Sequence, residues 1–187
     1  MTIFKRLKYF DGTEKDLHIP NGKNNIIDAN HLLALPALID PHVHYRVPGA
    51  EHKEDWMSGA KAAINGGITT VFDMPNNIPS CVTYENLVKK KATINQQLEE
   101  VKIPIRYQLY FGAAKDQLDE IPKAKGEVAG LKIFMGSSTG NMLIDDAVSL
   151  DKAFKLAADN DMVVAVHAED EEIIRRNKEL YAGINDP

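Results

Sequence analysis

The sequence predicts an α/β fold in which a parallel sheet follows a short amino-terminal β segment. From residue 33 onward, five short apolar runs alternate with amphipathic stretches, which is the pattern of consecutive strand-helix units. Residues 1 to about 34 instead contain short β-prone runs separated by Asp-Gly and Asn-Gly, both of which mark turns and favour hairpins. We therefore expect a β segment over residues 1–34 and an α/β part over residues 35–187.

The elements of the α/β part follow from apolar periodicity. Short apolar runs predict buried strands at Leu33–Ile39, Ile68–Met74, Ile105–Phe111, Leu131–Met135 and Met162–His167. Helical spacing predicts helices at Asp55–Asn65, after Thr83 as a helix cap, at Asp116–Ala124, at Ser149–Asn160 and at Asp170–Tyr181. This alternation favours parallel strands joined by right-handed crossovers. The carboxyl ends of such strands meet at the face where open sheets and (β/α)8 barrels build their sites.

Composition argues against nucleic-acid and membrane partners. The formal net charge is −5, and Lys and Arg are dispersed rather than gathered in a stripe, which disfavours nucleic-acid binding. No apolar run reaches membrane-spanning length, and the first residues lack the apolar stretch of a signal peptide. The single cysteine, Cys81, excludes internal disulfides, so we expect a cytoplasmic protein.

His42 and His44 are the strongest sign of chemistry in the chain. On an extended backbone, residues two apart point to the same face, so two imidazoles at the end of a buried strand can bind one metal ion. Neutral imidazole is a good ligand for zinc-like cations. The alternative is that both are ordinary polar residues in a turn.

Lys132 and His167 are the next candidates. Lys132 lies within an apolar strand, where a lysine is costly unless it is paired or neutral. Burial lowers the pKa of such an amine, and the neutral amine reacts with carbon dioxide to give a carbamate that can bridge two cations. The alternative is a lysine that snorkels from an edge or pairs with a carboxylate. His167 ends the fifth predicted strand, where it either reaches the shared face or is an ordinary strand-end histidine.

Arg46 and Asn76 are candidates for binding a substrate. The planar guanidinium of Arg46 suits a carboxylate, although a structural salt bridge with Glu51, Glu54 or Asp55 is the alternative. Asn76 follows the second predicted strand and either holds a substrate by its amide or serves the turn. The segment 136–140 is rich in glycine and hydroxyl groups, but it lacks the Gly-Lys-Ser/Thr ending of a phosphate-binding loop.

These motifs together resemble a known family. The segment from Leu35 to Gly49, with His42, His44 and Arg46 inside it, resembles the metal-binding signature of the cyclic amidohydrolases, and within them the dihydroorotase group. The segments that agree, in order along the chain, are 51–55, 66–71, 74–76, 130–136 and 166–170. The resemblance spans roughly residues 25 to 187.

The resemblance implies a fold and a metal centre. The fold would be the first five β-α units of a TIM-like (β/α)8 barrel, flanked by a small β-sandwich to which residues 1–34 contribute. His42 and His44 would bind one zinc ion and His167 a second, with the carbamate of Lys132 between them. Arg46 and Asn76 would hold the carboxylate of dihydroorotate, whose ring opens to N-carbamoyl-aspartate in pyrimidine biosynthesis. Dihydropyrimidinases, hydantoinases and allantoinases tend to carry another residue in place of Arg46.

The resemblance also places two functional groups beyond residue 187. The family's remaining metal-binding histidine lies on the sixth strand, and its catalytic aspartate on the eighth, so no catalytic residue falls in this chain. Because five strands cannot close a barrel, we expect a fragment of a longer enzyme or a truncated product with exposed sheet edges and a tendency to form homo-oligomers. The alternatives are another cyclic amidohydrolase and a non-catalytic binding or assembly protein.

Overall fold

The computed structural model describes residues 1–136 and 141–184. The chain divides into two compact units, Met1–Leu38 and Ile39–Pro187. Four residues of the glycine-rich segment 136–140 lie outside the described residues, and so does the phosphate-loop alternative that concerned them. No helix among the described residues is long and apolar enough to cross a membrane.

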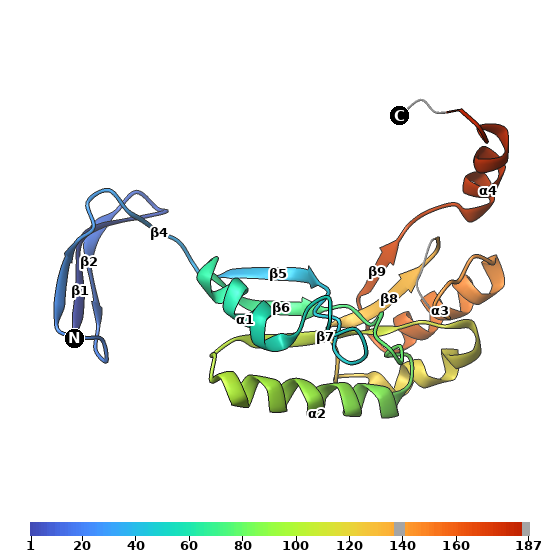
Figure 1. Ribbon diagram of the computed structural model, residues 1–187, viewed down its shortest axis with the longest axis horizontal. Coiled ribbons are helices and arrows are strands. Elements are labelled where there is room, and N and C mark those ends of the chain that lie inside the picture. The colour runs from blue at the N-terminus through green and yellow to red at the C-terminus, as the bar shows by residue number, and fades with distance from the viewer. Residues whose placement is uncertain (137–140, 185–187) are drawn as a thin grey trace. The chain divides into compact units, whose positions relative to one another are not determined.

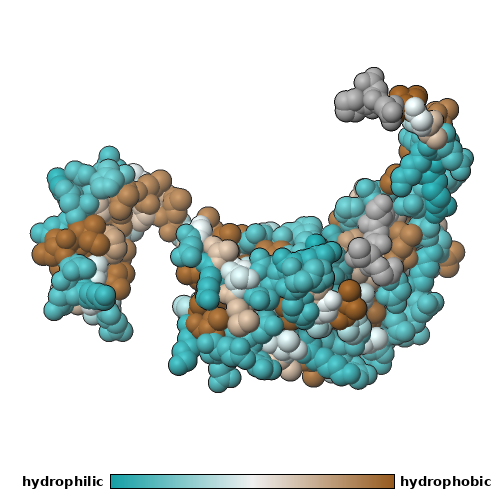
Figure 2. Space-filling model, viewed as in Figure 1, coloured by the Kyte–Doolittle hydropathy of each residue, from teal (hydrophilic) through white to brown (hydrophobic). Residues whose placement is uncertain are grey.

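The first unit is a small sheet built around strand β1, Thr2–Tyr9. Strand β2, Glu14–Ile19, pairs antiparallel with β1 across the Asp-Gly turn, as the sequence predicts for a hairpin. The second turn signal does not make a hairpin, because β3, Asn25–Asp28, pairs in parallel with β1 and not antiparallel with β2. The short strand β4, Leu33–Ala34, also pairs with β1. Apolar surface is visible on this unit (Figure 2), where Ile26 and Leu33 are exposed.

The second unit contains an open five-stranded sheet in the order β5-β6-β7-β8-β9. Its strands are β5 (Leu38–Val43), β6 (Ile68–Asp73), β7 (Arg106–Gly112), β8 (Gly130–Phe134) and β9 (Val164–His167). The pairs β6–β7, β7–β8 and β8–β9 are parallel, and each strand neighbours the next one along the chain. This confirms the predicted α/β class and the half-barrel of consecutive units, with β5 and β9 as its two ends (Figure 1).

One predicted strand is wrong in its bounds. The run Leu33–Ile39 is split into β4, which joins the first sheet, and β5, which begins at Leu38 and continues to Val43. Pro36 separates the two, because proline has no N–H to give to a ladder. Pro41 is accommodated inside β5 because this strand is at the edge of the sheet. His42 therefore lies within the strand rather than after it.

The connections between the strands are helical, and side chains cap four of them. The helices are α1 (Trp56–Asn65), α2 (Tyr84–Val101), the 3-10 helix η1 (Lys115–Ala124), α3 (Ala147–Asp159) and α4 (Glu171–Leu180). The predicted cap is confirmed, since the Thr83 hydroxyl oxygen accepts a hydrogen bond from Asn86 N at 3.2 Å. Asp55, Asp146 and Asp170 cap α1, α3 and α4 in the same way.

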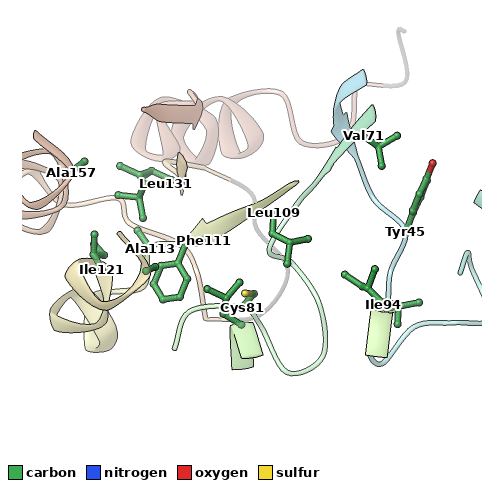
Figure 3. Packing of buried hydrophobic residues seen from close by; sticks show 14 of the residues in the cluster. Tyr45, Val71, Cys81, Ile94, Leu109, Phe111, Ala113, Ile121, Leu131 and Ala157 are labelled. Atoms are coloured by element: carbon green, nitrogen blue, oxygen red, sulfur yellow. The ribbon is translucent and has the colours of Figure 1, made fainter. Parts of the chain in front are cut away.

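The core lies between the sheet and a layer formed by α1, α2, η1 and α3. Alternate strand residues point into this layer, and Figure 3 shows Val71, Leu109 and Leu131 among the packed side chains. Leu131 and Ile133 are both fully buried in this core. Because successive strand residues point to opposite faces, Lys132 between them faces away from the helices. The fold thereby directs a lysine to the side of the sheet that the helices leave open.

Candidate metal centre

His42 and His44 lie side by side at the end of β5. Val43 between them packs against the core, so both imidazoles are directed to the opposite side. Their ring centroids are 5.2 Å apart and the planes are tilted by 49°. His42 is exposed and His44 is partly buried. The spacing that the sequence indicates therefore produces a pair of neighbouring imidazoles.

Asn76 contacts His44 directly. Its Oδ1 lies 2.8 Å from His44 Nδ1, so the ring donates its Nδ1 hydrogen to the amide oxygen. This hydrogen bond fixes the tautomer and leaves Nε2 with a free lone pair, which is the arrangement that outer partners impose on metal-binding histidines. The sequence predicts that Asn76 binds a substrate, and nothing in its spacing indicates the contact with His44. Its Nδ2 group remains able to donate to a substrate.

Lys132 is buried on the same side of the sheet. Only 3% of the residue is exposed, and burial lowers the pKa of its amine. Its Nζ lies 5.1 Å from the centre of the Phe134 ring. No carboxylate in residues 1–136 or 141–184 forms an ion pair with it, so the salt-bridge alternative finds no support in this part of the chain. A buried lysine without an opposite charge is costly as an ammonium ion.

His167 ends β9, directly opposite Phe134 of β8 in the parallel register. Val164 of the same strand packs against the core, so His167 faces the side on which Lys132 lies. Its Nε2 is 3.2 Å from Glu169 Oε2, and its ring centroid is 6.0 Å from that of Phe134. His167 is thus placed two residues along the neighbouring strand from Lys132.

Electrostatics link the four groups. The pKa of His42 is lowered by burial first, and then by the positive charges of Lys132 and His167. The pKa of His44 is also lowered, mainly by burial, and the positive charges of Arg46 and His42 lower it further. Its hydrogen bond to Asn76 acts in the opposite direction and raises the pKa. His42 is therefore close enough to Lys132, His44 and His167 to sense their charge. Both rings are biased toward the neutral form that can bind a metal.

Arg46 lies in the loop after β5 with a left-handed backbone, at φ 62°. The three carboxylates proposed as its alternative partners have other contacts: Glu51 accepts from Gly49 N, and Glu54 and Asp55 accept from Ser58. No ion pair between Arg46 and a carboxylate occurs within the described part of the chain. The guanidinium is therefore available for an external anion, and it lies near enough to His44 to affect its pKa.

The donor set fits a metal only if Lys132 takes part. Among the described residues, no group of three or more His, Cys, Asp or Glu side chains is arranged to hold a metal ion. The two neighbouring imidazoles supply two ligands, whereas metal centres in proteins usually have at least three from the chain. A carbamate on Lys132 would convert a cation into an anionic oxygen donor on the same side of the sheet. The chemistry of the buried amine is therefore what makes the site suitable.

The unfolding free energy of the metal-free chain is expected to fall as the pH drops below about 6.5, the ordinary pKa of histidine. The pKa values of His42 and His44 are lowered in the folded state. The unfolded chain therefore binds protons first, and stability rises with pH in this range. Urea unfolding between about pH 5 and about pH 7.5 should show a shallower dependence for His42→Gln/His44→Gln than for the chain itself.

The exposed His52 provides the control for this measurement. His52→Gln should leave the pH dependence in place, because His52 is not among the groups whose charge acts on His42 or His44. An equal dependence in the double variant and in the unsubstituted chain would contradict the assignment.

Two residues near this site escaped the analysis of the sequence. Asp73, at the end of β6, accepts a hydrogen bond from Tyr45 N at 2.8 Å, and its Oδ2 lies 2.6 Å from Lys90 Nζ. Tyr45 is the residue between His44 and Arg46, so this contact concerns the site. The sequence contains one sign of this pair. Lys90 lies on the same face of α2 as the buried Leu87 and Ile94, where an apolar residue is expected.

Comparison with known proteins identifies the family of the chain. The model of the amidohydrolase family matches residues 33–184, which covers both histidines, Lys132 and His167. The chain belongs to the amidohydrolase family. This membership accounts for a half-barrel whose candidate ligands share one side of a parallel sheet.

Individual amidohydrolases agree with this assignment. The chain is 40% identical over 146 residues to a dihydroorotase of Halobacterium salinarum, covering 77% of this chain and 33% of that protein. It is 35% identical over 182 residues to a dihydroorotase of Listeria welshimeri, covering 91% of this chain and 40% of that protein. The solved L-hydantoinase of Arthrobacter aurescens superposes with a TM-score of 0.82 at 26% identity, covering 99% of this chain and 44% of that one. The chain thus spans between a third and a half of each of these amidohydrolases.

Proposed function

We propose that this chain supplies the metal ligands and the substrate arginine of a zinc-dependent hydrolase that opens cyclic amides, with dihydroorotate as the substrate. The observation that carries the proposal is Lys132, buried at 3% exposure, without a carboxylate partner among the described residues and within electrostatic reach of His42. The likeness to two dihydroorotases supports the choice of substrate class. The reaction would belong to cytoplasmic pyrimidine biosynthesis.

Lys132 becomes a ligand by reacting with carbon dioxide. The lone pair of its neutral amine forms a bond to the carbon, one C–O double bond becomes a single bond, and the nitrogen loses a proton to solvent. The lowered pKa of Lys132 favours the neutral amine that this step requires. The product would be held beside His42, His44 and His167, which together would bind two zinc ions.

The bound metals would supply a hydroxide nucleophile at neutral pH, because zinc lowers the pKa of its water. The residues of this chain would prepare the rest of the site. Asn76 fixes the His44 tautomer through the 2.8 Å contact, so that Nε2 is the ligand. Arg46, without an internal ion-pair partner among the described residues, would bind the substrate carboxylate with two parallel hydrogen bonds.

The experiment has two readouts on the purified chain. Zinc content after dialysis is measured by elemental analysis, and carbon-13 NMR in labelled bicarbonate detects the carbamate carbonyl. We expect bound zinc together with a carbamate resonance. The absence of both bound zinc and a carbamate resonance at neutral pH would contradict the proposal. Turnover of dihydroorotate is assayed beside them, and bound zinc without turnover would favour the truncated or the non-catalytic alternative.

A hydantoin-type substrate is the second candidate, favoured by the TM-score of 0.82 to the L-hydantoinase. Arg46 separates the two candidates, since dihydrouracil and hydantoin rings have no carboxylate for it to bind. Binding of dihydroorotate and dihydrouracil is compared by calorimetry in the chain and in Arg46→Met. Loss of dihydroorotate binding alone supports the first candidate, and tighter binding of dihydrouracil supports the second.

Self-association also stays a prediction. The edge strand β5 carries Ile39 with 60% exposure, and β9 carries Val166 with 42% exposure. Sedimentation velocity over a range of concentrations would determine whether these edges lead to a homo-oligomer.

A further inference from the structure

Lys90 and Asp73 form a buried ion pair next to the candidate metal centre. The exposed fractions of their side chains are 1% and 0%, and Lys90 Nζ lies 2.6 Å from Asp73 Oδ2. The pair comes from two elements, since Lys90 projects from α2 and Asp73 ends β6. Burying two charges costs much of what their attraction returns, and apolar residues in their place often stabilise a protein equally well. A gain in stability is therefore a poor explanation for the pair.

The pair contacts the two loops that carry the site. Asp73 Oδ1 accepts a hydrogen bond from the buried Tyr45 N at 2.8 Å, between His44 and Arg46. Lys90 Nζ donates to Met74 O at 2.8 Å, two residues before Asn76. One side chain thus holds the loop after β5, and the other holds the loop after β6.

At the site itself the two loops meet through one side-chain hydrogen bond, between His44 and Asn76. Farther along, Asn77 Nδ2 donates to Val47 O and Ile78 N donates to Pro48 O, so the contacts of Asp73 and Lys90 add to these at the end nearest the imidazoles. His44 Nδ1 meets Asn76 Oδ1 only while the two loops keep their register. Asp73 suits its position because a carboxylate has two oxygens, one for Tyr45 N and one for Lys90. Lys90 suits its position because an ammonium group offers several hydrogens, enough for Asp73 and for Met74 O.

We infer that Lys90 and Asp73 are positioning residues that hold the loops after β5 and β6 in register, so that His44 is presented through Nε2 in one tautomer. Neither residue is among the proposed metal ligands or substrate-binding residues, and the pair acts on them through Tyr45 N and Met74 O. The effect on the loops follows from the contacts alone, whereas its consequence for metal binding rests on the proposed function.

The test uses nitrogen-15 NMR of the metal-free chain. The ring nitrogens of His44 report its tautomer, and hydrogen exchange of Tyr45 N reports its bond to Asp73. The amide of Leu131, which donates to Val163 O in the core, is the internal reference, because global unfolding accelerates both amides together. The variants are Lys90→Met, Asp73→Asn and the double variant Lys90→Met/Asp73→Leu.

In all three variants, the hydrogen-exchange rate of the Tyr45 amide is expected to rise at least about tenfold relative to that of the Leu131 amide. This factor corresponds to the loss of one charge-assisted hydrogen bond. His44 should then populate both tautomers. The double variant leaves no unpaired charge, so it keeps the proposal testable if a single variant fails to fold. Ile94→Ala, one turn along the buried stripe of α2, is the matched control, in which both amides accelerate together and the tautomer persists.

If the double variant kept both the ratio of the Tyr45 and Leu131 exchange rates and the His44 tautomer, the positioning role would be overturned. The pair would then be merely structural. Cobalt affinity, followed by its visible absorption, is the second readout and should fall about tenfold or more in the same variants. If the unsubstituted chain binds no cobalt while the NMR effects appear, the proposed metal centre fails and the positioning role stands.

Discussion

Replacing Lys132 with methionine is expected to abolish the carbamate resonance and to lower zinc affinity by at least about a hundredfold, beyond what loss of an outer partner usually costs. Methionine matches the length and apolar character of the lysine stem, so the packing beside Phe134 is preserved. What disappears is the amine, and with it the anionic ligand that the imidazole pair lacks. Zinc content and carbon-13 NMR, measured on the same samples, check both parts.

The same substitution should not destabilise the chain. The pKa of Lys132 is lowered in the folded state, so the unfolded chain holds the proton more tightly. Below the ordinary lysine pKa of about 10.4, this difference in pKa between the folded and unfolded chain lowers the free energy of unfolding. The free energy of unfolding therefore rises as the pH approaches that value. Lys132→Met removes the opposing effect at neutral pH. The midpoint of urea unfolding is therefore expected to stay the same or to rise.

The exposed Lys155 on α3 provides the matched control. Lys155→Met makes the same chemical change where water solvates the charge, and it should alter neither zinc content nor the carbamate resonance. If Lys132→Met kept full zinc affinity, the two imidazoles would have to bind without it. The proposed role of the lysine would then be lost.

Strand alternation made much of this site predictable. Parity alone puts His42 and His44 on one side of β5, and it puts Lys132 opposite the core residues Leu131 and Ile133. Parallel order does the rest, because β8 and β9 are neighbours and their carboxyl ends coincide. These are local rules, and they depend on only a few residues at a time. The α/β class and the helix caps follow from rules of the same kind.

What could not be predicted depends on contacts between distant segments. The bounds of β5 failed because Leu33 and Ala34 are apolar in either sheet, and only pairing with β1 decides which one they join. The bond between His44 and Asn76 spans 32 residues, and no spacing rule connects two loops. Asp73 and Lys90 each break a local pattern, yet nothing in either pattern says that they pair. Such contacts follow from the register of the loops, which the fold determines as a whole.

Replacing Trp56 with alanine is expected to lower the free energy of unfolding by about 3–5 kcal/mol, the usual cost of removing a buried aromatic ring. Trp56 is fully buried at the start of α1. Its ring lies edge-on to Tyr45 at 4.7 Å and to Tyr107 at 5.1 Å, so it joins the site loop to β7. Because Tyr45 separates His44 from Arg46, the cavity should loosen the site as well as the core. Urea unfolding gives the stability, and cobalt affinity reports the site.

Phenylalanine at the same position separates ring packing from the polar edge of the indole. Trp56 Nε1 is buried and has no hydrogen-bond partner among the residues that the structure describes, which costs about 1–3 kcal/mol in a folded protein. Trp56→Phe removes that orphan donor while keeping an aromatic ring against Tyr45, so its loss should stay below about 2 kcal/mol. Phe154→Ala, at a residue that is 43% exposed, is the control and should cost less than Trp56→Ala. Equal losses for Trp56→Ala and Phe154→Ala would mean that Trp56 does not anchor the layer between α1 and the sheet.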